Sequence, residues 1–255
     1  TLISNKKIKI LNLPVVKDIE TMIFLLRSLG SNIRLSKNNS AIDVDNSKNI
    51  KTFASYNLVK TMRAGILVLG PLLARFGKAK VSLPGGCAIG ARPVDVHLKA
   101  LSKLGVRYKI INGYIYATAT NGLIGNIIKF PKISVGATEN VIIAATYAKG
   151  ITYLKNCACE PEINDLAAFL KQAGAIIEGV GTPTIHVQGV QSLSGVEGYN
   201  VMPDRIEIGT YLIAAAISGG DITVTQTDQT SNEALIKCLQ KIGLNIEQTP
   251  EGIRC

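Results

Sequence analysis

Apolar residues recur at helical spacing in four stretches of the chain, and a glycine follows each stretch. The stretches begin at Asp18, Asp95, Asn164 and Asn232. The glycines that follow them are Gly30, Gly105, Gly174 and Gly243. Because glycine readily adopts the left-handed conformation that commonly ends a helix, each pattern predicts a helix that stops at its glycine. Each glycine then leads into a short strand, a polar turn and a second strand.

A second type of helix alternates with the first. Its three copies read "NLVKTMRAGILVLGPLLARFG", "ATENVIIAATYAKG" and "RIEIGTYLIAAAISGG", and each runs through glycine into a strand. One repeat unit therefore reads helix, strand, helix, strand, strand, and the chain holds three units and the back half of an earlier one. Repeated units of this kind bury their apolar faces against one another, so the pattern predicts an α/β fold.

One loop interrupts the regularity of the repeat. The span from the end of a second-type helix to the end of the following helix is 28 residues in the first copy, against 24 and 23 in the others. The surplus lies around "GGCAIGARP", so Cys87 falls on an inserted, glycine-rich loop, where function is often carried. A reactive thiol needs exposure and nearby positive charge, which Arg92 or Arg63 can supply. The alternative is an inert, buried cysteine.

Two helix entries have features that suit an anion. Pro93 and Asp95 follow Arg92 at the start of one helix, and Lys132 precedes a small-residue turn at the start of another. Backbone N–H groups at a helix start favour negative charge. The alternative for Asp95 is that it only caps its helix.

Composition favours a folded, intracellular protein. Of 255 residues, 47% are hydrophobic and 18% charged, which provides a substantial core. The formal charge of +10 suits phosphorylated small molecules, or is only a lysine-rich surface. The lysines are scattered without interleaved aromatics, so nucleic acid is not an expected partner.

The cysteines, histidines and apolar stretches indicate the cellular compartment and whether the chain binds a metal. Five cysteines, no visible secretory signal and no apolar run long enough to span a bilayer favour the cytoplasm, with no membrane attachment. Cys157 and Cys159 lack partner ligands, and His97 and His186 lie far apart in sequence. We therefore expect no metal site.

Five motifs make the chain resemble the UDP-N-acetylglucosamine carboxyvinyltransferases, within the EPSP synthase-like family of enolpyruvyl transferases. These motifs are "LPGGCAIGARPVD", "LVKTMRAGILVLGPLLARFG", "ISVGAT", "EPEI" and "MPDRIEIGTYLIAAAISGG". The resemblance covers essentially the whole chain. It implies an inside-out α/β barrel of βαβαββ units, here incomplete. It also implies two domains: residues 1–202, carrying the catalytic loop with an incomplete first unit, and residues 203–255, the start of a second.

The resemblance also implies a reaction and a set of site residues. The enolpyruvyl group of phosphoenolpyruvate would move to the 3-hydroxyl of UDP-N-acetylglucosamine, at the first committed step of peptidoglycan synthesis. The resemblance implies that no metal and no organic cofactor takes part. Cys87 would be the general acid and form a covalent adduct, and would be alkylated by the drug fosfomycin. Arg92 would bind phosphate through a bidentate fork. The remaining substrate-binding residues would be Arg63, Pro93, Val94, Asp95, Val96, Lys132, Ile133, Ser134 and Val135.

The chain also departs from the family pattern. A Lys-Asn pair for phosphoenolpyruvate, the proposed base and further arginines have no counterpart in it, and Cys159 stands where arginine is common. We therefore expect the isolated chain to be inactive without a complementary segment. The alternatives are a decayed or split scaffold that only binds a UDP-sugar or a partner, and a shikimate-pathway transferase, whose members lack the cysteine loop.

Overall fold

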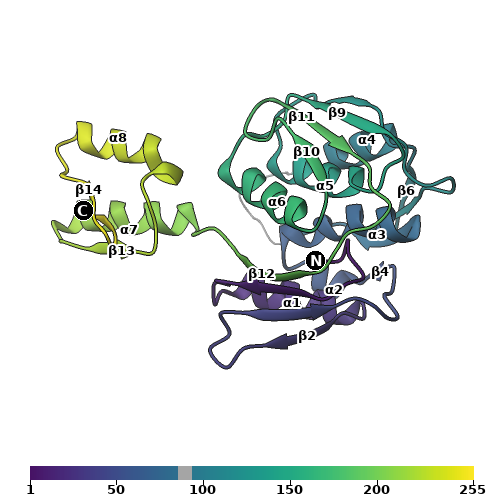
Figure 1. Cartoon of the computed structure of the whole chain (residues 1–255), viewed down its shortest axis with the longest axis horizontal. Helices are drawn as coiled ribbons and strands as arrows, with labels where there is room; N and C mark the ends of the chain where they lie inside the picture. Colours follow the sequence, from purple (N-terminus) through teal and green to yellow (C-terminus); the bar gives the residue numbers. More distant parts are fainter. Residues whose placement is uncertain (86–93) are drawn as a thin grey trace. The chain divides into compact units, whose positions relative to one another are not determined.

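The structure, a computed structural model, describes residues 1–85 and 94–255 (Figure 1). The chain divides into two compact bodies, the N-terminal body Thr1–Val201 and the C-terminal body Met202–Cys255. Each body has a hydrophobic core of its own.

Three four-stranded sheets build the N-terminal body, and all three share one strand order. The first sheet runs β12 (Val196–Asn200), β1 (Ile8–Leu11), β3 (Ile42–Asp45) and β2 (Asn32–Leu35). The second runs β4 (Phe53–Ala54), β5 (Lys78–Ser82), β7 (Tyr114–Thr118) and β6 (Arg107–Ile111). The third runs β8 (Ile127–Lys129), β9 (Ile151–Lys155), β11 (Thr184–Gln188) and β10 (Ile176–Glu178).

Each sheet begins with one parallel pair of strands, and its other pairs are antiparallel. The parallel pairs are β12 with β1, β4 with β5 and β8 with β9. The leading strand of each pair was absent from the sequence-based repeat unit. With it, the unit becomes βαβαββ, which confirms the fold implied by the resemblance. Because β12 pairs with β1, the two ends of the N-terminal body meet in one sheet.

Two sets of helices pack with these sheets. The first-type helices are α1 (Lys17–Ser28), α4 (Asp95–Lys103) and α6 (Pro161–Gln172). The second-type helices are the 3-10 helix η1 (Arg63–Val68) continued by α3 (Leu69–Phe76), and α5 (Val135–Ala145), while α2 (Tyr56–Val59) is a single turn. Helix α5 packs against α3, α4 and α6 (Figure 1). Its Ala137, Val141 and Ala144 are fully buried, which explains its apolar sequence.

The glycines that were predicted to stop the first-type helices do so. Gly30, Gly105, Gly174 and Gly243 have φ values of +102°, +93°, +102° and +103°. At Gly30 the chain also passes close to Asn49, because a Cβ there would lie 2.5 Å from the Asn49 carbonyl oxygen. A side chain at this position would therefore meet both strain and a clash.

The C-terminal body has one sheet and two α-helices in the described residues. The sheet runs β13 (Thr223–Thr225), β15 (Gly252–Arg254) and β14 (Glu247–Gln248), all antiparallel. Helix α7 (Arg205–Ser218), the 3-10 helix η2 (Thr230–Asn232) and α8 (Glu233–Lys241) complete it. Asp204 caps α7 by accepting hydrogen bonds from the N–H groups of Ile206 and Glu207, at 2.8 and 3.3 Å.

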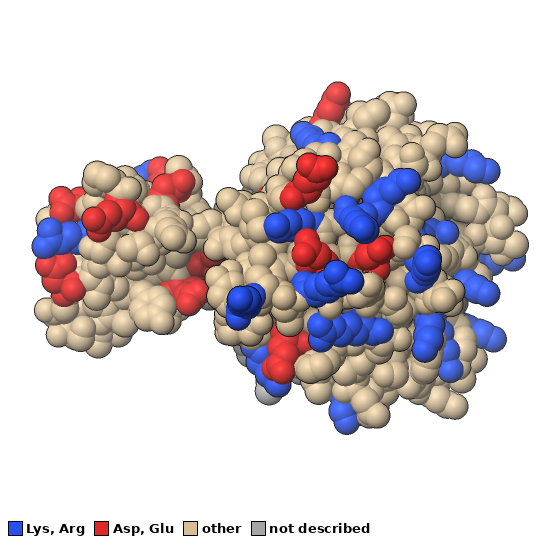
Figure 2. Space-filling view, turned by 60° about the horizontal axis from the view of Figure 1, so that its bottom comes forward, with Lys and Arg blue, Asp and Glu red and all other residues tan. Residues whose placement is uncertain are grey.

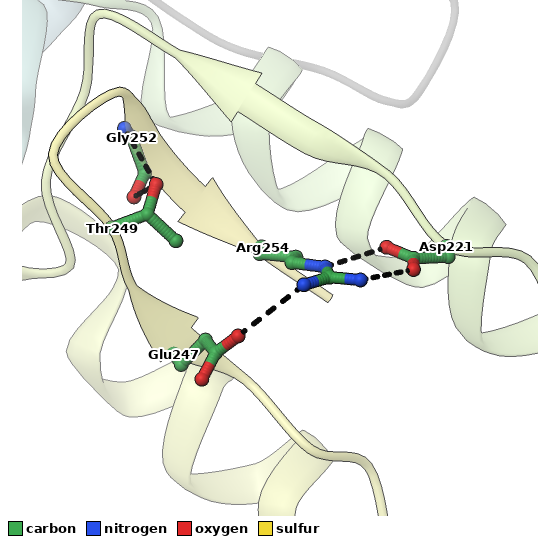
Figure 3. A network of polar contacts seen from close by, with 5 residues as sticks. All are labelled: Asp221, Glu247, Thr249, Gly252 and Arg254. Carbon is green, nitrogen blue, oxygen red and sulfur yellow. Dashed lines mark hydrogen bonds and ion pairs between the residues drawn. The ribbon is translucent and has the colours of Figure 1, made fainter.

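One arginine ties the sheet of the C-terminal body together at its surface. The guanidinium of Arg254 donates to both carboxylate oxygens of Asp221, at 2.9 and 2.6 Å, and lies 3.8 Å from a carboxylate oxygen of Glu247 (Figure 3). All three side chains are more than half exposed, so solvent weakens the pairing.

The positive charge of the chain is concentrated in the N-terminal body. This body holds 24 of the 28 lysines and arginines and 11 of the 18 acidic residues. Figure 2 shows lysine and arginine side chains spread over one of its faces. None of the helices in the described parts of the chain combines the length and the apolar character needed to cross a bilayer.

Candidate functional site

Three of the predicted site residues, Cys87, Arg92 and Pro93, lie outside the described residues. The others lie at the starts of three helices: Arg63 at η1, Val94 to Val96 at α4, and Lys132 to Val135 at α5. Helix α5 packs against both η1 and α4. The fold therefore brings together helix entries that are up to about 70 residues apart in the chain.

The entry of α4 places one carboxylate at the surface and two apolar residues in the core. Val94 and Val96 are buried, whereas the side chain of Asp95 is 44% exposed. A hydrogen bond from Lys99, with Nζ 3.3 Å from Oδ2, lowers the pKa of Asp95, and the charge of Lys132 lowers it further. Asp95 is therefore ionised at neutral pH, and the charge of Lys132 acts on it from the entry of α5.

The entry of α5 is capped by its own serine. The hydroxyl of Ser134 accepts a hydrogen bond from the N–H of Ala137 at 3.3 Å, which satisfies one of the free donors of the first turn. Lys132 and Ile133 precede the cap and are exposed, and Val135 opens the helix half-buried. An anion at this entry would meet the positive end of the helix dipole beside the Lys132 ammonium.

A buried amide joins the helices that carry the three entries. The Oδ1 atom of Asn140, on α5, accepts from the backbone N–H of Gly70 at 2.7 Å, and its Nδ2 donates to the carbonyl oxygen of Ile66 at 3.1 Å. The same Nδ2 lies 3.2 Å from Nδ1 of His97 on α4. Because a backbone N–H can only donate, the amide orientation is settled, and Nδ1 of His97 must be the acceptor. The His97 proton is therefore on Nε2.

His97 is a neutral residue at physiological pH. It is only 3% exposed, and burial lowers its pKa to about 4, with the positive charge of Arg63 lowering it further. It packs closely against the entry of α5, since a Cβ at Gly136 would lie 3.3 Å from Cε1 of the ring. A side chain at residue 136 would therefore require the His97 ring to shift by a few tenths of an ångström.

Sequence reasoning did not identify His97 and Asn140 as part of this arrangement. One signal was available: Asn140 is an amide in a helix whose neighbours Val141 and Ile142 are fully buried. A buried amide must find hydrogen-bond partners inside the protein, so an asparagine in such a helix indicates a polar link to another element. The partners themselves could not be read from the sequence.

A group of carboxylates lies at the junction of α5 and α6. Burial raises the pKa of Glu139 to about 7, and the charges of Glu162 and Glu160 raise it further. Among the described residues no group of three or more His, Cys, Asp or Glu side chains could hold a metal ion.

Two cysteines directly precede α6 in the chain. Cys157 is buried, and burial raises its pKa to about 11, whereas Cys159 is exposed.

This arrangement is suited to holding an anionic ligand. Arg63 and Lys132 provide positive charge, the entry of α5 provides backbone dipole, and Asp95 provides one fixed acceptor for a donor group of a ligand. The Asn140–His97 link sets the spacing of the helices that carry these groups.

Two relatives of similar sequence share one name. The chain is 62% identical over 246 residues to the UDP-N-acetylglucosamine 1-carboxyvinyltransferase of Pelagibacter ubique, a match that covers 96% of this chain and 58% of the relative. It is 51% identical over 253 residues to the protein of the same name from Vesicomyosocius okutanii, covering 99% of this chain and 60% of the relative. The chain thus spans about 60% of the length of these relatives.

Solved structures support the fold at lower sequence identity. The enolpyruvyl transferase NikO from Streptomyces tendae matches with a TM-score of 0.84 and 19% identity, over 99% of this chain and 60% of that one. EPSP synthase from Acinetobacter baumannii matches with a TM-score of 0.73 and 17% identity, over 98% and 59%.

A sequence model of one family matches the whole chain. Its description is EPSP synthase (3-phosphoshikimate 1-carboxyvinyltransferase), and the match covers residues 1–255. The match extends through both compact bodies, and the relatives and solved structures agree with it. The chain therefore belongs to the EPSP synthase family of enolpyruvyl transferases.

Proposed function

We propose that this chain is part of an enzyme that transfers the enolpyruvyl group of phosphoenolpyruvate to the 3-hydroxyl of UDP-N-acetylglucosamine. The observation that carries the proposal is the name shared by the relatives, at 47–62% identity over nearly the whole chain. Shikimate 3-phosphate, the acceptor implied by the family description, is the competing substrate. The cysteine loop "GGCAIG" favours the nucleotide sugar, by the resemblance described above.

The reaction divides into an addition and an elimination. Cys87 protonates the methylene carbon of phosphoenolpyruvate, and the neighbouring carbon becomes electrophilic. The sugar hydroxyl adds to that carbon and loses its proton to a general base. Phosphate then leaves as a proton is lost from the new methyl group, which restores the carbon–carbon double bond in the product. Arg92 binds the phosphate and stabilises the charge that develops on it.

The described residues bind and orient the acceptor. Lys132 and the entry of α5, formed by Ile133, Ser134 and Val135, take the diphosphate, whose negative charge suits the ammonium and the helix dipole. Asp95 accepts from a donor group of the uracil or ribose, and Val94 and Val96 anchor the segment that carries it. Arg63 contributes positive charge to the same region. The net positive charge of the N-terminal body favours the arrival of both anionic substrates.

A chimera tests the proposal directly. The matched region of the Pelagibacter ubique relative is replaced by the corresponding residues of this chain, and phosphate release from phosphoenolpyruvate is measured with each acceptor. We expect release that depends on UDP-N-acetylglucosamine and is lost in the Cys87→Ala chimera. Phosphate release that occurs only with shikimate 3-phosphate would show that the proposed acceptor is wrong.

The isolated chain provides a second test, which separates binding from turnover. We expect calorimetry to detect binding of UDP-N-acetylglucosamine, weakened about tenfold or more by Lys132→Ala, because a charged contact to phosphate contributes about 1.5–3 kcal/mol. The matched control is Lys129→Ala, which removes a lysine from an exposed strand position. Equal losses in the two variants would contradict the assignment of the diphosphate to the α5 entry.

A further inference from the structure

The positive charge of the N-terminal body is concentrated in the part of the chain that builds its second sheet. Residues 46–138 contain 14 lysines and arginines but one acidic residue, Asp95, whereas the rest of this body holds ten basic and ten acidic residues. Four of the 14 cations lie on the strands of the second sheet, and none of the four is a predicted site residue. They are Lys78, Lys80, Arg107 and Lys109.

The second sheet turns these cations and three aromatic rings away from the core. Alternate side chains of its two central strands, β5 and β7, are buried, and these are Ala79, Val81, Ile115 and Ala117. The residues between them therefore point outward. Across the strands, Lys80 pairs with Phe53 on one side and with Tyr116 on the other, and Tyr116 also pairs with Lys109. We call this surface the basic–aromatic face, and it consists of Phe53, Lys78, Lys80, Arg107, Lys109, Tyr114 and Tyr116.

Three rings of the basic–aromatic face surround the ammonium of Lys80. The Nζ atom lies 4.8 Å from the ring centroids of Phe53 and Tyr114, and 4.9 Å from that of Tyr116. The Tyr114 ring is held in place because its hydroxyl accepts a hydrogen bond from the backbone N–H of Tyr56 at 3.2 Å. Phe53 is 45% exposed, and both tyrosines are half-buried. The face thus presents fixed rings beside cations.

The shared topology of the three sheets does not require this composition. On the outer face of the first sheet, Asp43 pairs with Lys9 on one side and with Arg34 on the other, so the charges alternate in sign. Charges on an edge strand discourage unwanted strand pairing, which explains Arg107 and Lys109 of β6. That effect does not explain the lysines of the central strand β5 or the rings beside them.

We propose that the basic–aromatic face binds single-stranded nucleic acid, with bases stacked on its rings and phosphates bound by its cations. Charge complementarity selects a polyanion, because in the described parts of the chain none of the four cations forms an ion pair with a carboxylate. Rings on an open sheet favour unpaired bases, whose flat faces are free to stack. An acidic polypeptide or an anionic lipid surface would use the cations but offers no planar group to the rings.

The alternation of rings and cations arises between strands. Along the chain, Phe53, Lys80 and Tyr116 are far apart, which is why the sequence alone did not favour nucleic acid as a partner. The pairing of β4, β5 and β7 brings them into one row. The proposal rests on this row and on the charge of the second sheet, and it does not depend on the proposed reaction.

Fluorescence anisotropy of labelled oligouridine and oligothymidine, each of about ten nucleotides, tests the proposal. We expect the 255-residue chain to bind one or both at low salt. Four phosphate contacts would make the logarithm of the association constant fall with the logarithm of salt concentration with a slope of about −3. Absence of binding by a chain that circular dichroism shows to be folded would overturn the proposal.

An aromatic substitution separates stacking from general attraction by charge. We expect Tyr116→Leu to weaken binding about fivefold or more, because a stacked base loses its ring. Tyr153→Leu is the matched control, on β9 of the third sheet, where Tyr153 is 38% exposed. Equal affinities of the two variants would contradict the stacking.

A charge substitution locates the bound strand. Arg107→Ala and Arg34→Ala each remove an exposed arginine from an edge strand, β6 of the second sheet and β2 of the first. We expect only Arg107→Ala to reduce the salt slope, by about 0.7, which corresponds to one phosphate contact. If Lys132→Ala weakens binding as much as Arg107→Ala does, the oligonucleotide binds at the α5 entry and the proposal is wrong.

Two further probes decide between classes of partner. Polyglutamate and phosphatidylglycerol vesicles carry negative charge without bases, so we expect both to bind more weakly than the oligonucleotides and to be insensitive to Tyr116→Leu. Tighter binding of either probe, lost in Arg107→Ala and retained in Arg34→Ala, would assign the face to an acidic polypeptide or to a lipid surface and would overturn the proposal.

Discussion

The side-chain amide of Asn140 donates from Nδ2 to Nδ1 of His97 across 3.2 Å, with both residues buried. Through this contact α5 is joined to α4, and through its bonds to Ile66 and Gly70 the same amide is joined to η1 and α3. One side chain thus sets the relative position of the helices whose entries form the candidate site. The predictions below test this link and the titrating groups around it.

The first prediction concerns the amide itself. Asn140→Ala leaves the Gly70 N–H and the Ile66 carbonyl buried without their partner, so we expect a loss of about 2–4 kcal/mol in the free energy of unfolding. Asn126→Ala is the matched control, because Asn126 makes its hydrogen bonds at the exposed surface. Urea unfolding followed by circular dichroism measures both. A loss no larger than that of the control would contradict the role of Asn140.

The second prediction concerns the close approach of α3 to α5. A Cβ at Gly70 would collide with the amide oxygen of Asn140 and lie 2.5 Å from its carbonyl oxygen, so α3 and α5 must separate in Gly70→Ala. We expect the free energy of unfolding to fall by about 2 kcal/mol or more, as is typical of overpacking in a core. Gly198→Ala is the control, because its nearest contact would be ordinary, at 3.5 Å from a methyl group of Leu11. Equal unfolding midpoints for the two variants would refute this explanation.

The third prediction concerns Glu139, whose pKa is raised to about 7 by burial and by the charges of Glu162 and Glu160. Between its usual value of 4.5 and about 7, the folded state binds more protons than the unfolded state, so this group lowers stability as pH rises. Glu139→Gln removes that dependence. We expect the variant to gain stability relative to the parent from pH 4.5 to 7, reaching about 2–4 kcal/mol above pH 7. A difference that stays constant with pH would exclude this effect.

The fourth prediction concerns His97, whose lowered pKa changes stability with pH in the opposite direction to Glu139. Burial lowers its pKa from 6.5 to about 4, so in this range the unfolded state binds more protons and stability falls as pH decreases. The variant His97→Gln retains an acceptor for Asn140. When the pH falls from 6.5 to 4, we expect its free energy of unfolding to decrease by about 2–4 kcal/mol less than that of the parent. A parallel decline of parent and His97→Gln would contradict the assignment.

Some features of the fold and of the candidate site could be predicted from the local sequence, and others could not. The helices that end at Gly30, Gly105, Gly174 and Gly243, and hence the repeat, could be predicted because helical spacing and glycine conformation are local properties. The starts of α4 and α5 were singled out for the same reason, as short motifs of charge, proline and small residues. The roles of the residues in them came from the resemblance.

Strands β4, β8 and β12 were missed because their evidence is not local. Strand β4 is two residues long, and β12 is paired with β1 from the other end of the body. Such strands form only when a partner strand supplies the hydrogen bonds, and no periodicity in two to five residues reveals that partner.

Local sequence patterns were thus enough to predict the α/β repeat, the glycines at which its first-type helices end, and the residue types that begin α4 and α5. The pairing of β12 with β1, and the link from His97 through Asn140 to Gly70, could be found only in the folded structure. The reason is physical: local preferences act over a few residues, whereas burial and hydrogen-bond satisfaction are met between segments brought together by the whole fold.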